Sequence, residues 1–288
     1  MKKVILLISF LIAFSQINSY AQGIYLKITP GYSTPTNMRS GFENYSIRYS
    51  YAISYVIEEH ENINGGFGKG ININGTIGYS KNKNLSFELE SAFMRGLKFE
   101  TTSRYIYYGS EDKFTSSYEA QLISFTPTMV LSTGQDKINA YMSNGLILGF
   151  PSVKRELVYN GYDGREEQLN IKYSTNLAKG LATKIRLESQ LKNERIFFFA
   201  EISFTYLMYS PEKSEVTEYL IYGYDSTSVL NTSEKYTEYS DNFSVNYTID
   251  EDTNQLIESY DRSKPYRAAR IDMPFGNIRF NLGFKFKI

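Results

Sequence analysis

The chain of 288 residues contains no cysteine, no tryptophan, one histidine and no net formal charge. Without cysteine, disulfides, thiol nucleophiles and cysteine-ligated metal sites are excluded. A net charge of zero removes the electrostatic attraction that drives non-specific nucleic-acid binding, so we expect no nucleic-acid partner.

The first 21 residues have the order of a secretory signal peptide, with a basic start, an apolar run over 4–14 and small residues at Ser19 and Ala21. The apolar run is shorter than the roughly 20 residues that a transmembrane helix needs. We therefore expect residues 1–21 to be cleaved as a signal peptide and residues 22–288 to form a single domain. The alternative is a retained N-terminal anchor.

Tyrosine and phenylalanine are abundant, at 26 and 19 residues, and apolar and polar residues alternate over long stretches. The last stretch, Ile278 to Ile288, has apolar residues at every even position and polar or small residues at every odd one. A period of two is that of a β-strand with one apolar and one polar face.

The same alternation predicts eight strands, at 23–33, 67–80, 85–100, 118–131, 138–150, 176–189, 196–209 and about 273–288. Long and short connections alternate between these strands, the long ones being 34–66, 101–117, 151–175 and 210–271. The hairpin formed by 67–80 and 85–100 has strands that match or exceed the roughly 9–11 residues of a tilted membrane strand.

Short turns on one side and long loops on the other are typical of an outer-membrane barrel with both chain ends in the periplasm. We therefore predict an all-β fold, an eight-stranded antiparallel up-and-down transmembrane β-barrel with long extracellular loops, located in the outer membrane. Extra hairpins within 45–57 and 216–257 would lengthen the barrel above the membrane or raise the count to ten strands. A soluble secreted barrel or sandwich with its apolar face inward is the alternative.

Most charged residues of these strands, Lys98 among them, lie on the face opposite the apolar one. A lipid-facing Lys or Arg in mid-membrane costs about 2–4 kcal/mol, so we expect the charged face to point into the barrel. There it would form a paired network that leaves no wide pore. Its predicted members are Glu88, Glu90, Lys184, Arg186, Glu201 and Arg279. Within it, Glu201→Ala is expected to destabilise the fold by leaving inward cations unpaired.

Lys69 and Arg95 break this rule, because each shares the parity of the apolar residues in its strand. Counted from the intervening turn, both lie about 25 Å up the barrel, at the outer edge of the apolar band. We expect the two cations to contact lipopolysaccharide phosphates there. Simple snorkelling to the interface without a specific ligand is the alternative.

Four residues at the end of the chain, Asn281, Gly283, Phe286 and Ile288, resemble the C-terminal signal of outer-membrane barrels, with Ile288 where an aromatic residue is usual. The whole pattern is similar to the family of small outer-membrane β-barrels that includes OmpA-like, OmpX-like and PorT-like domains. The resemblance implies a fold, an outer-membrane location and contact with the barrel-assembly machinery. It implies no activity.

Three motifs can be interpreted either as structural or as catalytic or ligand-binding. His60, between Glu59 and Glu61, is interpreted as a solvated loop residue, against the catalytic histidine of a lipid A deacylase. The spacing of Asp250, Asp252, Asn254 and Asp261 is that of a calcium loop, but Gln255 stands where that loop needs glycine, which favours a hairpin turn. The glycines of 65–70 lack the strand-to-helix context of a phosphate loop. We expect no metal and no cofactor.

Tyrosines gather in the expected loops, where they either bind a partner or stack on one another to stiffen the loops. They are Tyr45, Tyr49, Tyr51, Tyr55, Tyr105, Tyr107, Tyr108, Tyr159, Tyr162, Tyr219, Tyr222, Tyr224, Tyr236, Tyr239 and Tyr247. The sequence thus favours a non-enzymatic outer-membrane protein whose loops serve adhesion, surface protection or docking of an extracellular or envelope protein. A lipid-modifying enzyme and a narrow pore are the alternatives.

Overall fold

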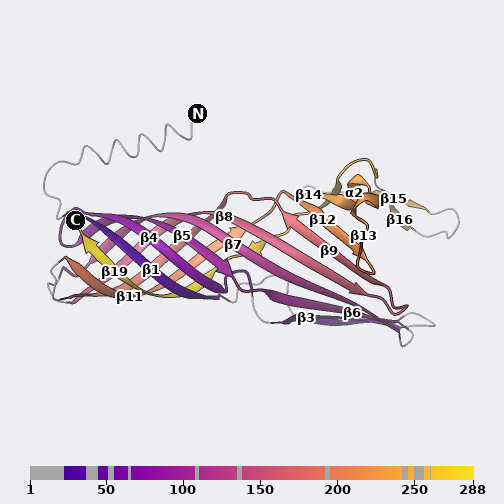
Figure 1. The fold of residues 1–288 in the computed structure, drawn as a ribbon, viewed down its shortest axis with the longest axis horizontal. Coiled ribbons are helices and arrows are strands. Elements are labelled where there is room, and N and C mark those ends of the chain that lie inside the picture. The colour runs from indigo at the N-terminus through magenta and orange to yellow at the C-terminus, as the bar shows by residue number, and fades with distance from the viewer. Residues whose placement is uncertain are drawn as a thin grey trace.

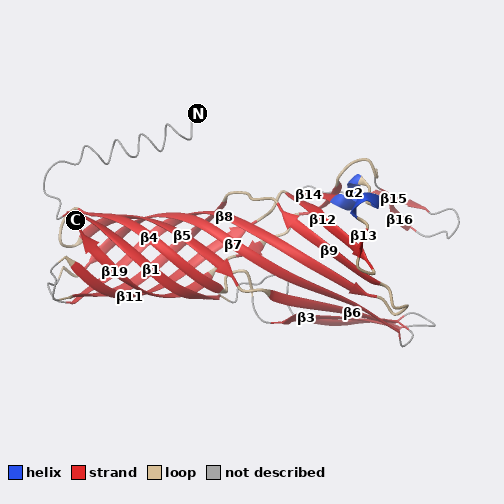
Figure 2. Cartoon of the chain, in the orientation of Figure 1, coloured by secondary structure: helices blue, strands red, loops and turns tan. Residues whose placement is uncertain are grey.

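The computed structural model describes residues 23–36, 45–50, 55–63, 66–107, 110–134, 138–191, 195–241, 246–249, 256–259 and 261–288. The expected signal peptide, residues 1–21, lies outside these ranges. Most of the described chain is β-strand (Figure 2), with a short helix, α2 (Thr232–Lys235), and a 3₁₀ turn, η1 (Thr227–Val229). The predicted all-β class is confirmed.

Eight strands pair in a circuit that returns to its starting strand, in the part of the molecule that carries the C-terminus. In pairing order they are β1 (Gly23–Pro35), β4 (Gly70–Ser80), β5 (Leu85–Gly96), β7 (Ser110–Ser132), β8 (Ile138–Asn160), β10 (Ala178–Gln190), β11 (Ile196–Tyr209) and β19 (Asn277–Lys287). Every neighbouring pair is antiparallel, and β19 pairs with β1 from Lys287↔Tyr25 to Asn277↔Pro35. We call this barrel-like part the ring (Figure 1). Its lower end is the one that carries the C-terminus, and its upper end is the opposite one.

Beyond the ring, at the end away from the C-terminus, the sheet continues as an extension, to the right in Figure 1. It comprises the outer parts of β7 and β8, about 110–119 and 152–160, together with β2 (Tyr45–Ser50), β3 (Tyr55–Ile63), β6 (Phe99–Tyr107), β9 (Glu166–Tyr173), β12 (Lys213–Ile221), β13 (Tyr224–Asp225), β14 (Tyr236–Ser240) and β17 (Tyr266–Ala269). The short β18 (Met273–Pro274) pairs with β11, while β15 (Asn246–Ile249) and β16 (Leu256–Ser259) form a separate hairpin. The main sheet has 17 strands, so the eight-stranded barrel that the sequence predicts is not confirmed.

The prediction that 101–117 and 151–175 are loops is wrong. Both β7 and β8 have 23 residues and run far beyond the predicted strand limits, and β6 and β9 pair alongside them. These segments lack the alternation of apolar and polar residues by which the sequence predicts a strand. Their backbones nevertheless continue the hydrogen-bonded pairing of the sheet. The hairpin expected within 45–57 corresponds to the paired β2 and β3.

In the ring, apolar side chains point outward and polar ones inward. Along β4, exposed Ile71 and Ile73 alternate with buried Asn72 and Asn74, and the other strands of the ring show the same order. Leu146 on β8 is 61% exposed. Thus the described part of the ring has the facing opposite to that of a soluble β-barrel, whose apolar face is inward.

Gly283 on β19 supplies a test of how closely the ring is packed. A Cβ atom there would lie 2.5 Å from the carbonyl oxygen of Ile28 and 2.7 Å from the ring of Phe199. We predict that Gly283→Ala lowers the free energy of unfolding by about 1–3 kcal/mol, because the strands must move apart. Urea-unfolding midpoints measure this change. The control is Gly75→Ala on β4, where a Cβ meets no atom within 4 Å; equal midpoints for the two variants would contradict the prediction.

Candidate functional site

The ring interior collects charged side chains from strands far apart in the sequence. Glu88 on β5 is at the centre of one group. Its carboxylate accepts hydrogen bonds from Lys27 Nζ at 2.7 Å, Arg186 Nη1 at 3.0 Å and the Tyr25 hydroxyl at 2.7 Å. All four side chains are buried, so Glu88 depends on these three donors to compensate for its lost hydration.

A second group lies around Glu90, two residues further along β5. Lys184 Nζ donates to one carboxylate oxygen, and Arg279 Nη1 is 3.8 Å from the other. Glu201 is less engaged than the sequence suggests, since it lies 4.0 Å from Arg186 Nη1 and accepts one hydrogen bond, from Asn281 Nδ2 at 3.3 Å. Glu88 therefore has more and shorter contacts with the interior cations than Glu201, which the sequence places in the same network.

Lys285 belongs to the same interior but is missing from the predicted network. Its ammonium group donates to Glu188 at 2.6 Å and lies over three rings, 4.7 Å from Tyr25, 5.0 Å from Phe197 and 5.4 Å from Tyr141. Carboxylate and ring faces together compensate the buried cation. The parity of Lys285 and Glu188 indicates their inward direction, but their partnership depends on a strand register that the sequence does not reveal.

Between the charges and the extension, the ring is filled by an apolar layer that sequence reasoning missed. Phe67 packs edge-on against Phe99 and Tyr118, with ring centroids 4.9 Å and 5.6 Å apart, and stacks on Phe275 at 5.4 Å. Their buried neighbours include Met94, Leu122, Ile147, Val153, Leu207 and Tyr209. The available signal was the change from polar to apolar residues on the inward parity near the upper ends of β5, β7, β8 and β11.

The same packing continues into the extension as a cluster of tyrosines around Arg155. Arg155 Nη2 donates to Ser116 Oγ at 2.8 Å, and its guanidinium lies 5.7 Å from the Tyr118 ring. Burial raises the pKa of Tyr118 to about 12 and that of Tyr239 to about 12. Burial thus further disfavours ionisation of both phenols, as is usual for tyrosines in a structural core.

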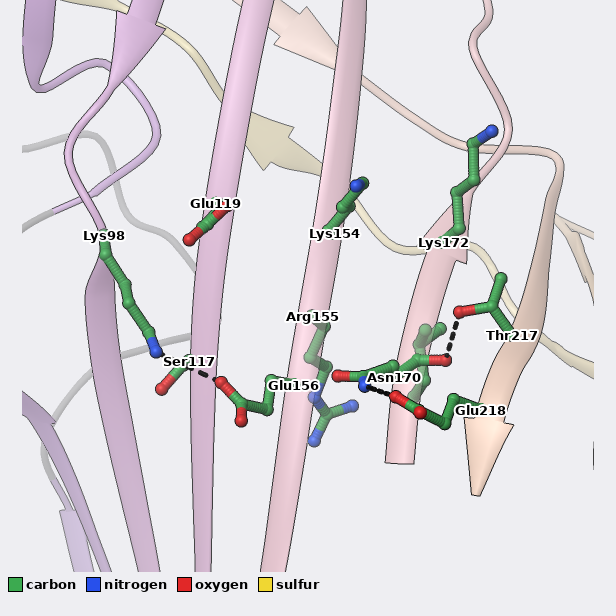
Figure 3. A pocket seen from close by; sticks show the side chains of 11 residues that line it. Lys98, Ser117, Glu119, Lys154, Arg155, Glu156, Asn170, Lys172, Thr217 and Glu218 are labelled. Atoms are coloured by element: carbon green, nitrogen blue, oxygen red, sulfur yellow. Dashed lines mark hydrogen bonds and ion pairs between the residues drawn. The ribbon is translucent and has the colours of Figure 1, made fainter. Parts of the chain in front are cut away.

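A pocket of about 510 Å³ opens on the outer face of the extension (Figure 3). Lys98 pairs with Glu156 across it at 3.1 Å, and Asn170 donates to Glu218. Lys154 on β8 lies directly opposite Lys172 on β9. The predicted inward direction of Lys98 is wrong, because the strand breaks at 97–98 and the alternation does not carry through the break.

Lys69 and Arg95 lie on the outer face of the ring at its upper end. Arg95 is exposed and opposite Ile71, and the Lys69 carbonyl accepts a hydrogen bond from the Leu97 amide at 2.9 Å. The structure thus places both residues beside the extension, and their contact with lipopolysaccharide stays a prediction. Of the C-terminal signal residues, Asn281 and Gly283 face inward, whereas Phe286 and Ile288 face outward.

The described tyrosines divide into stacked and exposed groups. Tyr105 and Tyr159 pack against Phe114, with ring centroids 5.6 Å and 4.7 Å away. In contrast, Tyr162, Tyr222 and Tyr224 are 70%, 59% and 77% exposed. The stacking interpretation therefore fits Tyr105 and Tyr159, whereas partner binding by the exposed tyrosines stays a prediction.

The exposed tyrosines lie at the tip of the extension. Tyr162 is in the turn between β8 and β9, and the Tyr222 amide donates to the carbonyl of Glu166, the first residue of β9, at 2.9 Å. Tyr222 has a φ of 51°, a left-handed conformation that is costly for a bulky residue and usually belongs to Asn or Gly in such a turn. We call Tyr162, Tyr222 and Tyr224 the tyrosine tip.

The remaining motifs are only partly within the described residues. His60 falls on β3, with its backbone opposite Ser103 of β6, while Asp250, Asp252 and Asn254 lie outside the described residues. Asp261 pairs with Lys264 at 2.9 Å. Within the described ranges, no three potential metal ligands come together, and no helix is long and apolar enough to cross a membrane.

No family model matches the chain, and no curated protein matches it. The likeness of residues 281–288 to the outer-membrane signal therefore stays a resemblance of pattern. Function is inferred below from the facing of the ring, its packed interior and the tyrosine tip.

Removing the charge of Glu88 tests the interior network. We predict that Glu88→Gln lowers the free energy of unfolding by about 3–5 kcal/mol, because Lys27 and Arg186 lose their shared counter-charge in a buried place. Glu201→Gln is the matched control and should cost less, since its carboxylate has fewer and longer contacts. Urea midpoints of the two variants and the parent measure the difference. A larger loss for Glu201→Gln would contradict the assignment of Glu88 as the centre.

Proposed function

We propose that residues 22–288 form a non-enzymatic protein of the outer membrane, exported with residues 1–21 as its signal peptide. The ring acts as an eight-stranded transmembrane β-barrel, and the extension presents the tyrosine tip to an extracellular or envelope protein. One observation carries the proposal: the strands of a closed circuit turn their apolar side chains outward. In water this exposed surface is unfavourable, whereas lipid makes it favourable.

The dimensions of the outward face support this assignment. On β11, exposed apolar side chains extend from Phe198 to Tyr206. At about 3.3 Å per residue and a tilt near 40°, this stretch covers roughly 20–25 Å of height, close to the apolar band of membrane barrels. Closure supports it as well, because lipid offers no hydrogen bonds to an open sheet edge.

The ends of the chain give the orientation. Short turns such as 81–84, the start of β1 and the end of β19 lie at the lower end of the ring, which is on the left in Figure 1, and the extension lies at the other end. In membrane barrels the short turns and chain ends are periplasmic. The extension is then extracellular.

The packed interior favours a structural barrel over a narrow pore. Buried ion pairs around Glu88 and Glu90 occupy the lower and middle levels, and the apolar layer around Phe67 occupies the upper one. Ions crossing the ring would have to displace both layers.

The assembly of the ring tests the membrane location. We predict that Phe286→Ser with Ile288→Ser abolishes outer-membrane insertion while secretion continues, because both outward side chains end the lipid face and the signal read by the barrel-assembly machinery. Heat-modifiable gel migration and membrane fractionation measure insertion. Lys287→Gln, on the same strand end, is the control and should insert normally. Normal migration of the double variant would contradict the proposal.

Substitution of the tyrosine tip tests whether the tip binds a protein partner. We predict that the combined variant Tyr162→Ser, Tyr222→Asn and Tyr224→Ser loses the protein that cross-links to the parent on intact cells. Its stability should be unchanged or up to about 1 kcal/mol higher, because Asn adopts the left-handed conformation more readily than Tyr.

Quantitative cross-linking with a urea midpoint separates these two effects. Tyr159→Ser is the control, since loss of its contact with Phe114 should lower stability and leave cross-linking intact. Unchanged cross-linking by the combined variant would remove the tip from the proposed function.

A further inference from the structure

We propose that the outward side chains of β8 and β10 form a lateral interface at which a second copy of this chain docks, with Asn144 at its centre. We call this surface the β8–β10 wall. It lies on the outward face of the ring, about half-way between the lower end and the extension. The proposal rests on the proposed function, because an exposed amide requires such a partner only where lipid surrounds the ring.

Asn144 is an exposed polar residue in the middle of an apolar face. It lies half-way between Ile138 and Phe150, the first and last exposed apolar residues of β8 in the ring. At about 3.3 Å per residue and a tilt near 40°, it is roughly 15 Å from either end of this stretch. The outward cations Arg95 and Lys179 are different, because they lie near the upper end of the ring, where long side chains snorkel to water.

The amide of Asn144 is only partly satisfied by its neighbour. Thr183 on β10 lies directly opposite and donates to Asn144 Oδ1 at 2.8 Å, while the Nδ2 group has no hydrogen-bond partner among the described residues. With the amide turned the other way, its oxygen would be the unpaired end. In either orientation one end of the amide needs a partner that lipid tails do not supply.

The backbone pairing beside Asn144 is also irregular. The pairing of β7 with β8 is interrupted at residues 126–127 and 146–147, and the register on either side brings Pro127 opposite Leu146. Pro127 has no N–H to donate, and proline is rare in a strand that has neighbours on both sides. Leu146 is the next outward residue above Asn144 on β8. The unpaired amide and the interrupted pairing therefore lie at nearly the same height of the ring.

Aliphatic side chains surround the polar pair. Met142 and Leu146 on β8 lie opposite Ile185 and Leu181 on β10, and all four are more than half exposed. β10 contains no aromatic residue, whereas the outward faces of β11 and β19 are rich in phenylalanine. Flexible aliphatic side chains around a central amide suit close packing against another protein surface.

The symmetry of a membrane selects a second copy as the occupant of the wall. Copies in one membrane share one orientation, so a two-fold axis that relates two of them runs along the membrane normal. Residues beside that axis meet their own counterparts at the same height. A carboxamide has a donor end and an acceptor end, so it is complementary to itself. The Nδ2 group of each Asn144 then donates to the second lone pair of the other Oδ1.

The test measures dimerisation of residues 22–288 in lipid vesicles by cross-linking with a bis-maleimide. Because the chain has no cysteine, Leu146→Cys supplies a single reactive thiol on the wall, and Leu181→Cys on β10 is a second probe of the same wall. Both probes should give a cross-linked dimer. Adding Asn144→Leu should weaken dimerisation about tenfold, the effect of two amide hydrogen bonds within a membrane, as measured over a series of protein-to-lipid ratios.

Two controls match these variants. Ile28→Cys places the thiol on β1, across the ring from β8, and should cross-link only by random collision. Ser91→Leu removes an exposed polar side chain from β5 and should leave dimerisation through Leu146→Cys unchanged.

The interface is overturned if Ile28→Cys cross-links as well as the wall probes, if Asn144→Leu has no effect, or if Ser91→Leu weakens dimerisation equally. Cross-linking in native outer membranes tests the other occupant. A product of the wall probes with a different protein, in place of the dimer, would give the wall to that protein and overturn the second copy.

Insertion into the vesicles, scored by heat-modifiable migration, separates this proposal from the proposed function. If the parent does not insert, both are overturned. If it inserts and the wall probes stay monomeric at every protein-to-lipid ratio, only the interface is overturned. Asn144→Leu should insert as well as the parent, because leucine suits a lipid-facing position, so its loss of cross-linking is distinct from a loss of folding.

Discussion

Pairing between the first and last strands of the ring is the interaction on which the rest of the structure depends. β1 has β4 on one side and β19 on the other, so no edge of the ring is left open. The register also fixes every direction. A slip of one residue in β19 would turn Arg279 and Lys285 outward and Phe284 inward, exchanging the two faces along the whole strand. The pairing of β1 with β19 thus closes the ring and also determines which side chains of β19 point inward.

Closure brings charges from distant parts of the chain into one enclosed space. Glu88 is separated by 61 residues from Lys27 and by 98 from Arg186, yet it bonds to both. Because each buried charge needs a partner at its own height, the charges concentrate in the lower and middle levels of the ring. An apolar layer needs no such matching. This explains why the Phe67 cluster fills the level where the ring passes into the extension.

The sequence predicts the ring better than the extension for a physical reason. Within the ring one face of each strand is apolar, so an apolar residue at every second position marks the strands. In 101–117 neither face is apolar, so the sequence does not reveal the strands there. Parity likewise predicts which side a charge faces but not its partner, so the sequence does not distinguish Glu88, which has three donors, from Glu201. The break at 97–98 resets the alternation and misplaces Lys98. Opposition of two lysines on different strands needs a register that only the fold supplies.

β8 connects the levels of the molecule, because it runs without interruption from the lower end of the ring to the tip of the extension. Phe150 ends its apolar face, Lys154 lies about 10 Å higher, and Asn160 precedes the turn that carries Tyr162, about 20 Å along the strand beyond Lys154. The outward apolar face of the ring and the tyrosine tip are therefore held apart by continuous β-ladders. Under the proposed function, a protein that binds the tip would meet it well above the apolar face of the ring.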